Sequence, residues 1–572
     1  MENLFKIWKI SPKKAKNFYL IFLLLSLLNS FLEVIALLSI LPILDNFINK
    51  SGTFISYLDN FLIFNLQIEP TKTFEIFLYL LIFVFLIKFL INFTFIYFNQ
   101  YLIKYLKAYF SKMMLESYLK EDYSFYTSIN TSLLLRNINI EIPRFISGVI
   151  TNTLNFISDT LLIISITTML LFYNFYATLL IGLIVFAFAL FYLFLTKTTI
   201  KNLGEKRHTY DGISLKNLRE IFDNIKTVKV LNKENFFSER FYNYLNKSLN
   251  THMIFNLVAS SPRIFLEFLV ILLIIIVCLL SNSNEGIIYT ISIYAGSAVR
   301  LIPSTTKIIN SLTNIKFDTP ILNILHDKIF LNKNNYPKVS NNSKNKNFNF
   351  NSFNSSIQFK NVSYNYEKIQ VLENINLKIK KNQIIGIIGK TGTGKSTFVD
   401  LLAGLIYPKK GEILIDDFIK LGMENSKHWQ SKIGYMSQEL TMIDGPLIEN
   451  IAFGVPIKNI DNDRILNCVR DSQLNLTIDQ IKNETSGERG IKFSGGEKQR
   501  LVLARTLYFD PEIIILDEFT NSLDAYTEEE ILKTIKSLNN KTRIIITHND
   551  KILKYCDQIF EIKDNNIFFS NK

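Results

Sequence analysis

The chain has 572 residues, enough for several domains, and it carries a net charge of +13. Its 48 Phe and 26 Tyr, its mean hydropathy of +0.19 and its long uncharged runs are typical of a membrane protein, so the positive charge favours a membrane surface over nucleic acid. The three cysteines, Cys278, Cys468 and Cys556, have neither CxxC nor metal-ligand spacing, which excludes a disulfide framework.

Six segments of the first half are long and apolar enough to cross about 30 Å of hydrocarbon. Their approximate limits are 18–44, 75–101, 146–172, 174–197, 254–280 and 286–310. The first follows a basic N-terminus, as a signal peptide does, but the run is too long for such a peptide and lacks a small-residue cleavage site. We therefore expect an all-α transmembrane domain of six helices over residues 1–332.

The basic residues of the loops predict how these helices are oriented. Lys residues crowd the N-terminus, and Lys and Arg recur between the second and third segments and between the fourth and fifth. The links around Tyr173 and around Ser281–Glu285 contain neither. Because basic loops stay on the cytoplasmic side, both termini are expected in the cytoplasm. The membrane is expected to be the bacterial inner membrane.

Two further stretches interrupt or follow the membrane segments. In the first external loop, Tyr57–Leu66 has the pattern of a short amphipathic helix lying on the outer membrane face, with an ordinary packed loop as the alternative. Residues 333–355 are rich in Asn, Lys and Ser, a composition that cannot bury a core and predicts a linker. From residue 356 to 572, β-branched strands alternate with polar helices, which predicts a soluble α/β domain.

A phosphate-binding loop lies near the start of this α/β domain. The stretch Gly389-Lys-Thr-Gly-Thr-Gly-Lys-Ser396 matches G-x-x-x-x-G-K-[ST] at every fixed position, between an apolar strand and a helix. Lys395 is expected to reach the β- and γ-phosphates of ATP, and Ser396 to ligate Mg²⁺. The nucleotide-binding residues predicted here are Gly389, Lys390, Thr391, Gly392, Thr393, Gly394, Lys395, Ser396 and Thr397.

Two carboxylates end a second apolar strand, Ile513-Ile-Ile-Leu-Asp-Glu518. Asp517 is expected to hold Mg²⁺ through water, and Glu518 to orient or deprotonate the water that attacks ATP. A simple helix cap is the alternative, which the P-loop in the same domain disfavours.

Upstream of this pair, Phe493-Ser-Gly-Gly-Glu-Lys-Gln-Arg500 resembles the Leu-Ser-Gly-Gly-Gln signature of the ATP-binding cassette (ABC) transporters, and the resemblance extends over the whole α/β domain. It implies that Tyr366 stacks on adenine, that Gln438 contacts Mg²⁺ and the membrane domain, and that His548 senses the γ-phosphate. It also implies that the signature of one domain faces the P-loop of a second domain across ATP. The signature residues concerned are Ser494, Gly495, Gly496 and Glu497.

Three positions depart from the family pattern: Phe493 replaces Leu, Glu497 replaces Gln, and the D-loop begins with Asn521. An added carboxylate at Glu497 is expected to slow closure rather than abolish hydrolysis, because the backbone donors of the signature remain. One helix set with one nucleotide domain resembles a type I exporter half-transporter, for which a homodimer is the default. Glu121–Phe125 and Ile225–Lys229 resemble the coupling loops of such exporters, with plain amphipathic loops as the alternative.

Cations inside the membrane segments point to the cargo. Lys88, Arg263 and Arg300 lie in the second, fifth and sixth segments, where charge is costly and usually functional. The residues around Arg263 and Arg300 resemble those of PglK-type flippases, which move lipid-linked oligosaccharides across the bacterial inner membrane. A polyprenyl-pyrophosphate is anionic, and Arg and Lys would neutralise it. Structural ion pairs are the alternative, since Glu267 lies one helical turn from Arg263, whereas Arg300 has no carboxylate within a turn.

The leading hypothesis is therefore an ATP-driven, Mg²⁺-dependent homodimeric flippase of a lipid-linked, anionic substrate. An exporter of peptide, lipid A-like lipid or drug is the alternative within the same class. A membrane-tethered regulatory ATPase that moves nothing is the alternative from another class.

Overall fold

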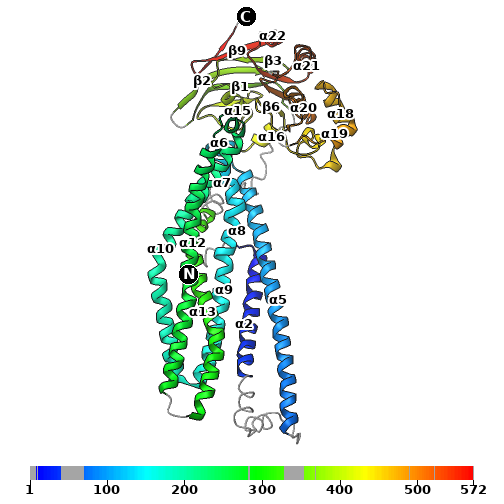
Figure 1. Ribbon diagram of the computed structural model, residues 1–572. Helices are drawn as coiled ribbons and strands as arrows, with labels where there is room; N and C mark the ends of the chain where they lie inside the picture. The colour runs from blue at the N-terminus through cyan, green and yellow to red at the C-terminus, as the bar shows by residue number, and fades with distance from the viewer. Residues whose placement is uncertain are drawn as a thin grey trace. The chain divides into compact units, whose positions relative to one another are not determined.

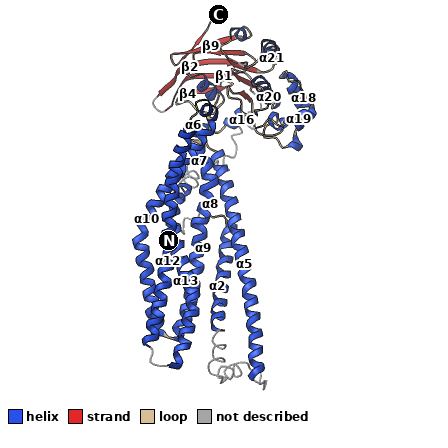
Figure 2. Cartoon of the chain, in the orientation of Figure 1, coloured by secondary structure: helices blue, strands red, loops and turns tan. Residues whose placement is uncertain are grey.

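The computed structural model describes residue 8 and residues 11–39, 70–280, 284–326, 353–366, 369–487, 490–520 and 522–570. It divides into two compact units, one of Met1–Glu121 with Ile129–Asn342, the other of Asp122–Ser128 with Ser343–Lys572. Helices make up the described part of the first unit, and the strands lie in the second (Figure 2). An all-α membrane domain followed by an α/β domain is the predicted fold class, which is confirmed.

Long helices dominate the first unit (Figure 1). They are α2 (Lys13–Leu38), α5 (Pro70–Leu119), α9 (Asn152–Tyr173), α10 (Phe175–Asp223), α12 (Glu234–Leu280) and α13 (Asn284–His326). The described parts of the six predicted segments fall in these helices, the third beginning just before α9. Over the described residues, five helices are long and apolar enough to cross a membrane. The α9–α10 link is Asn174 alone, whose side chain caps α10 by accepting from the Ala177 N–H at 3.1 Å.

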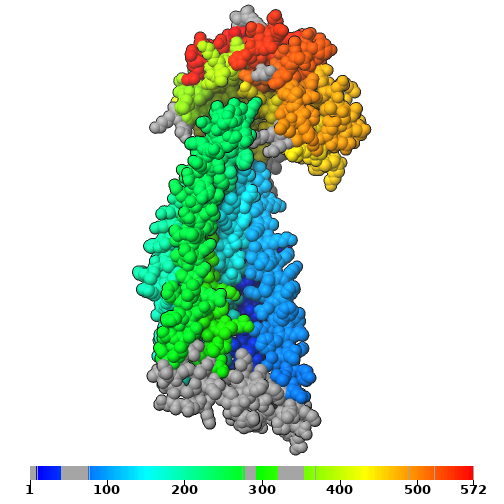
Figure 3. All heavy atoms as spheres, in the orientation of Figure 1, coloured from blue at the N-terminus to red at the C-terminus, as the bar shows by residue number. Residues whose placement is uncertain are grey.

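The surfaces of these helices suit a hydrocarbon environment. On α5, for example, Phe83, Phe89 and Phe93 are each more than 60% exposed. This helix forms the blue outer edge of the first unit in the space-filling view (Figure 3). Aromatic side chains exposed to this degree along several turns are disfavoured in water and expected against lipid.

Shorter helices connect the long ones. They are α6 (Tyr123–Ser128), α7 (Thr131–Arg136), α8 (Ile142–Arg144), α11 (Ile225–Val230) and two π-helical segments, η1 (Asn137–Glu141) and η2 (Phe145–Thr151). The predicted coupling stretches correspond to α6, which groups with the second unit, and to α11. The external segment 57–66 lies outside the described residues.

A buried ion pair and a glycine hold the chain of η2 close to α13. Arg207 Nη1 on α10 donates to Asp318 Oδ1 on α13 at 2.6 Å, and the Arg207 side chain is only 2% exposed. A Cβ atom at Gly148 would lie 1.7 Å from Asp318 Oδ2. Any residue other than glycine at 148 would therefore displace the carboxylate that Arg207 needs.

The second unit contains two sheets. The antiparallel sheet has the order β2-β1-β4-β5, and the other, largely parallel, has the order β10-β9-β3-β8-β7-β6. The strands are β1 (Ser356–Tyr366), β2 (Ile369–Lys380), β3 (Ile384–Ile388), β4 (Lys410–Ile415), β5 (Ile419–Lys420), β6 (Ile433–Met436), β7 (Ile513–Asp517), β8 (Thr542–Ile546), β9 (Gln558–Lys563) and β10 (Asn566–Phe569). Strands β7 and β8 are buried at every position, because structure covers both faces of the sheet.

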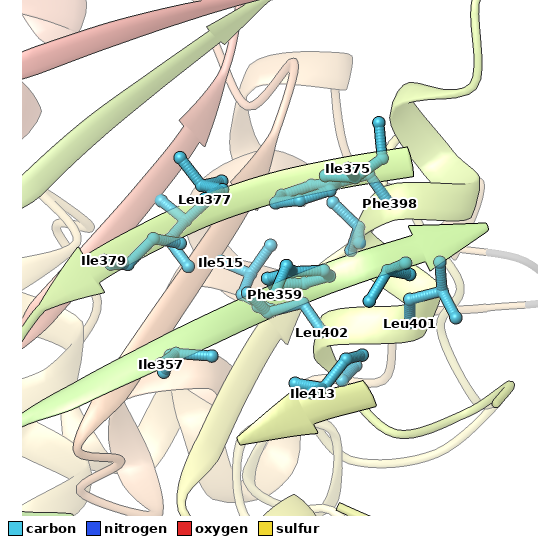
Figure 4. Packing of buried hydrophobic residues seen from close by; sticks show 14 of the residues in the cluster. Ile357, Phe359, Ile375, Leu377, Ile379, Phe398, Leu401, Leu402, Ile413 and Ile515 are labelled. Atoms are coloured by element: carbon cyan, nitrogen blue, oxygen red, sulfur yellow. The ribbon is translucent and has the colours of Figure 1, made fainter. Parts of the chain in front are cut away.

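Helices pack on and between these sheets. They are α15 (Lys395–Leu402), α16 (Ser426–Gln430), α17 (Leu447–Ile451), α18 (Asn462–Asp471), α19 (Ile478–Asn483), α20 (Gly495–Tyr508), α21 (Ala525–Ser537) and α22 (Asp550–Leu553). Figure 4 shows the main core, where Phe359 of β1 and Leu377 of β2 face Phe398 and Leu402 of α15. The rings of Phe359 and Phe398 stack at 4.9 Å. This core anchors the helix that begins at the phosphate-binding loop.

Most of the predicted linker, residues 333–352, lies outside the described residues. Its last three residues are packed against the second unit: the Phe353 N–H donates to Glu512 Oε2 at 2.8 Å, and the Ser355 N–H donates to Asp416 Oδ1 at 2.6 Å. Phe353 and Ser355 are therefore hydrogen-bonded into the second unit.

Candidate nucleotide site and membrane charge cluster

The predicted phosphate-binding loop joins β3 to α15. Gly392 and Gly394 have φ values of 85° and 103°, a left-handed conformation that favours glycine. Residues Gly389 to Ser396 therefore form a tight turn that leads directly into α15 at Lys395, and Thr397 lies buried in its first turn. The free N–H groups of this turn and of the helix N-terminus suit an anionic phosphate.

Lys395 lies across the mouth of the loop. Its Nζ donates to the carbonyl of Gly389 at 2.5 Å and to that of Lys390 at 3.3 Å, and it lies 2.9 Å from His548 Nε2. Burial lowers the pKa of Lys395, and the nearby Glu518 carboxylate opposes that shift. A phosphate oxygen in the loop would compete with these carbonyls for the three donors of the ammonium group.

Glu518 is the point at which three predicted residues meet. Gln438 Nε2 donates to Glu518 Oε2 at 2.7 Å, and His548 Nε2 lies 3.7 Å from Glu518 Oε1. Glu518 follows β7 with a φ of 49°, a strained conformation for a residue of this type, and its N–H donates to the Ile546 carbonyl of β8. The backbone thus turns sharply here and is held there by the neighbouring strand.

Asp517, at the end of β7, is 7% exposed. Burial, and then the adjacent Glu518 carboxylate, raise the pKa of Asp517 to about 6, while Lys395 opposes the shift. Asp400 on α15 is a third carboxyl that the sequence analysis missed; burial and Asp517 raise its pKa to about 6 as well. Asp400 lies one turn beyond Thr397 in the helix that follows the P-loop, and this position could have indicated that its carboxyl lies near the site.

The residues predicted to bind Mg²⁺ fit that ion by their chemistry. Asp517 offers a carboxylate whose ionised form is disfavoured until a cation approaches, Ser396 a hydroxyl, and Gln438 its amide oxygen. Among the described residues, no three His, Cys, Asp or Glu side chains form a metal-binding cluster. One carboxylate with neutral oxygens suits Mg²⁺, which keeps several waters and uses substrate phosphates as further ligands.

The signature begins α20, and here the substitution at Glu497 has a structural role. Ser494 is the N-cap, and Glu497 Oε2 accepts from the Ser494 N–H at 2.9 Å and from its hydroxyl at 2.8 Å. These hydrogen bonds lower the pKa of Glu497. The pair forms a capping box, so the carboxylate stabilises the start of the helix while holding the signature serine.

The rest of the signature is closely packed. A Cβ at Gly496 would lie 2.9 Å from the Ser522 carbonyl, and Phe493 packs against the helical core around α17–α20. Ser494 and Glu497 hydrogen-bond each other, and Gly495 and Gly496 lie against Ser522 of the D-loop. None of these four is a hydrogen-bond partner of Lys395 among the described residues. Asn521 lies outside the described residues. Tyr366, at the end of β1, is 39% exposed, with its ring 5.0 Å from that of Tyr364.

The first unit contains the predicted substrate cations, and two of them meet one carboxylate. Lys88 Nζ on α5 lies 2.7 Å from Glu33 Oε2 on α2, and Arg300 Nε on α13 lies 3.4 Å from the same oxygen. The side chains of Glu33 and Lys88 are buried, whereas that of Arg300 is 49% exposed. Arg263 instead pairs at 2.7 Å with Glu267 on its own helix, and both are exposed.

The sequence around Arg300 does not indicate Glu33 as its partner, because the two residues lie on different helices, α13 and α2. A carboxylate within the first predicted membrane segment was the signal that could have found it. We refer to Glu33, Lys88 and Arg300 together as the charge cluster.

Fold and site together define a P-loop ATPase domain joined to membrane-spanning helices. Residues 19–288 match the family model described as the ABC transporter transmembrane region, and residues 372–521 match the one described as ABC transporter. The two ranges together span well over half of the chain, which therefore belongs to the ABC transporters. Its one helical set followed by one ATPase domain is the arrangement of an exporter half-transporter.

Known proteins resemble the chain to different extents. A solved bacterial Atm1-family ABC exporter with ATP bound shares the fold, with a TM-score of 0.78 over 97% of this chain and 94% of that one, at 17% identity. The alpha-hemolysin translocation ATP-binding protein HlyB of Escherichia coli O157:H7 is 35% identical over 215 residues, 36% of this chain and 30% of that protein. A putative export ATP-binding/permease protein of Rickettsia felis is 27% identical over 379 residues, 64% and 63% of the two chains. In other curated relatives, the chain spans between 17% and 37% of the protein's length.

Proposed function

We propose that two copies of this chain form an exporter in the bacterial inner membrane that couples ATP hydrolysis to transport, with both termini and the ATPase domains in the cytoplasm. The separation of the site into two groups supports this. The P-loop group contains Lys395, Asp517 and Glu518, and the signature group contains Ser494 and Glu497. A second copy would supply the signature group to each bound ATP, and so complete two sites per dimer.

Within each site, the chain's own residues would perform the chemistry of hydrolysis. Glu518 would accept a proton from the attacking water, and Lys395 would balance the negative charge of the phosphates. His548, which lies beside both Lys395 and Glu518, would hydrogen-bond the γ-phosphate. A Mg²⁺ ion held by Ser396, Asp517 and the Gln438 oxygen would neutralise charge on the phosphates.

For the cargo, we propose a polyprenyl-pyrophosphate-linked oligosaccharide, which the exporter would flip across the membrane. The charge cluster is the observation that carries this proposal. Two cations share one carboxylate, so the cluster holds one unbalanced positive charge among membrane helices, and Arg300 is half-exposed. An uncompensated charge there is costly. A pyrophosphate would supply the missing negative charge and would match the donor fork of Arg300.

Arg263 and Lys88 would act beside Arg300 in this proposal. Lys88 would hold Glu33 in place and limit how far that carboxylate neutralises Arg300. Arg263 would contact the headgroup by exchanging its partner Glu267, one turn away on the same helix, for a phosphate, which would keep the cation paired with a negative charge.

Export of a peptide is the second candidate, because one relative, HlyB, is named for alpha-hemolysin translocation. That match covers 36% of this chain. The unbalanced cation favours an anionic lipid headgroup instead.

The test measures lipid flipping and ATP hydrolysis on the same purified protein in proteoliposomes. Arg300→Ala is expected to weaken headgroup binding by about 30-fold, the equivalent of about 2 kcal/mol for a charge-assisted contact, while basal ATPase activity persists. Arg300→Lys should rescue flipping in part, since it keeps the charge and loses the fork. Arg240→Ala is the matched control, because Arg240 is a half-exposed arginine on α12 that pairs loosely with Glu220.

Two outcomes would contradict the proposal. Equal loss of flipping and ATPase in Arg300→Ala would make Arg300 a structural residue. Stimulation of the ATPase by basic peptides, with none by polyprenyl-pyrophosphate lipids, would favour the peptide exporter.

A further inference from the structure

A cavity of about 490 Å³ lies among four helices of the first unit, α9, α10, α12 and α13. Its walls are largely aliphatic and aromatic; they include Phe156, Ile163, Val185, Leu193, Leu301 and Ile309. No charged side chain lines it among the described residues, and neither Lys88, Arg263 nor Arg300 contributes to its wall. The cavity is therefore separate from the charge cluster, although α13 contributes to both.

Four of the hydroxyl groups in the wall have hydrogen-bond partners. Thr160 and Thr167 donate to carbonyls of α9 at 2.6 and 2.7 Å, and the Thr178 and Tyr294 hydroxyls lie 2.8 Å apart. Ser297 is 1% exposed, and its Oγ has no hydrogen-bond partner among the residues that the structure describes. A buried hydroxyl without a partner is unfavourable, so an oxygen of a bound molecule would satisfy it.

We propose that this cavity binds an uncharged, long-chain lipid that carries one hydrogen-bonding oxygen, and that Ser297 contacts this oxygen. Each methylene takes about the same 30 Å³ as a water in the liquid, so the cavity has room for roughly 16 such groups. Occupation would restore the dispersion contacts that the cavity lining lacks. An anionic headgroup is excluded by the apolar wall, since no cation or bound water network offsets its desolvation.

This site is independent of the proposed cargo. A polyprenyl-pyrophosphate would be recognised through its negative charge at Arg300, whereas the cavity selects against charge. A chain of this length bound among α9, α10, α12 and α13 would instead act on the packing of these helices, as a ligand that favours one arrangement of them.

The experiment uses the full chain in nanodiscs and a hexadecan-1-ol with a photoreactive diazirine in its chain. We expect crosslinks on peptides of α9, α10 and α13 that unlabelled hexadecan-1-ol displaces. Hexadecane-1-sulfonate, of the same length but permanently charged, should compete at least about tenfold more weakly. Labelling that does not saturate, or equal competition by the sulfonate, would overturn the proposal.

Variants locate the bound chain. Ala298→Phe places a ring in the cavity and is expected to lower saturable labelling at least about tenfold. Val299→Phe is the matched control, because Val299 follows Ala298 in the chain but its side chain is 70% exposed and does not line the cavity. Ser297→Ala should weaken the binding of hexadecan-1-ol by about fivefold and leave the binding of a plain hexadecane probe unchanged. An equal effect of Ala298→Phe and Val299→Phe, or no effect of Ser297→Ala, would contradict the assignment.

Discussion

The charge cluster allows a quantitative prediction, because its three members differ in burial. Replacing Glu33 with Leu removes the carboxylate 2.7 Å from Lys88, whose side chain is 7% exposed. A buried charge that loses its partner costs about 3–5 kcal/mol. Arg300 loses the same partner, but it lies farther from Glu33, at 3.4 Å, and its side chain is 49% exposed, so we attribute most of the cost to Lys88.

The other variants of the cluster should then fall in a definite order. In Lys88→Met, Glu33 still has Arg300 at 3.4 Å, and we expect a smaller loss than in Glu33→Leu. The double variant leaves no buried charge, and replacing a buried pair by apolar residues is often neutral or stabilising. It should be more stable than Glu33→Leu by at least about 2 kcal/mol.

The assay is thermal unfolding of the full chain in nanodiscs, followed by the ellipticity of the helices, which dominate the first unit. The matched control is the pair Arg263 and Glu267 on one helix, where replacing both partners by Met and Leu should change stability much less than Glu33→Leu does, because both charges are removed together and neither side chain is buried between helices. If the Glu33→Leu, Lys88→Met double variant melts at or below Glu33→Leu, the pair does not compensate buried charge as the geometry indicates.

Four further results are expected for the ATPase domain. Glu518→Gln should lower ATP hydrolysis at least about a hundredfold while nucleotide still binds, as measured by turnover and by equilibrium binding; near-normal turnover would remove its catalytic role. Lys395→Ala should abolish tight binding of labelled ATP, and unchanged affinity would contradict the phosphate contact. Because the pKa of Asp517 is raised to about 6, its carboxyl stabilises the fold at low pH, and that contribution is lost as the pH rises through 6. The ionised carboxylate that forms above this pH is the one that would bind Mg²⁺. Mg²⁺–ATP should therefore raise the melting temperature more at about pH 7.5 than at about pH 5.5, and Asp517→Asn should reduce this difference. Glu497→Gln keeps an oxygen for the Ser494 N–H but removes a negative charge, so ATPase activity should rise with little change in stability; a fall in activity would mean that the carboxylate itself is required.

Short-range patterns were enough to predict which residues of the proposed nucleotide site lie close together. The P-loop is one continuous stretch that follows β3, and Asp517 and Glu518 end β7, which β8 separates from β3 in the same sheet. Because the three strands are parallel, their carboxyl ends lie at one edge, so this convergence follows from the geometry of the sheet. The capping role of Glu497 was also readable, since Ser-x-x-Glu at a helix start is a capping-box pattern. It was interpreted only as a departure from a family signature.

Contacts between helices that are far apart in the sequence could not be predicted from such short-range patterns. Glu33 and Lys88 are 55 positions apart, and nothing in either local sequence says which faces of α2 and α5 meet. The cavity is less predictable still, because it depends on how four apolar helices pack, and their residues would read equally as lipid-facing. Gly148 has no sequence signal that distinguishes it from any other helical glycine; only the position of Asp318 explains it.

The length of α10 has a mechanical consequence. Its 49 residues span about 74 Å, and the hydrocarbon core accounts for about 30 Å of that, so roughly 40 Å of unbroken helix extends beyond the bilayer. A rigid rod of this length is a lever: a tilt of about 5° at one end displaces the other by roughly 6 Å. The buried Arg207–Asp318 pair fastens this rod to α13, so the two helices would turn together and not slide past one another. Small rotations of the first unit would therefore become large displacements at the helix ends.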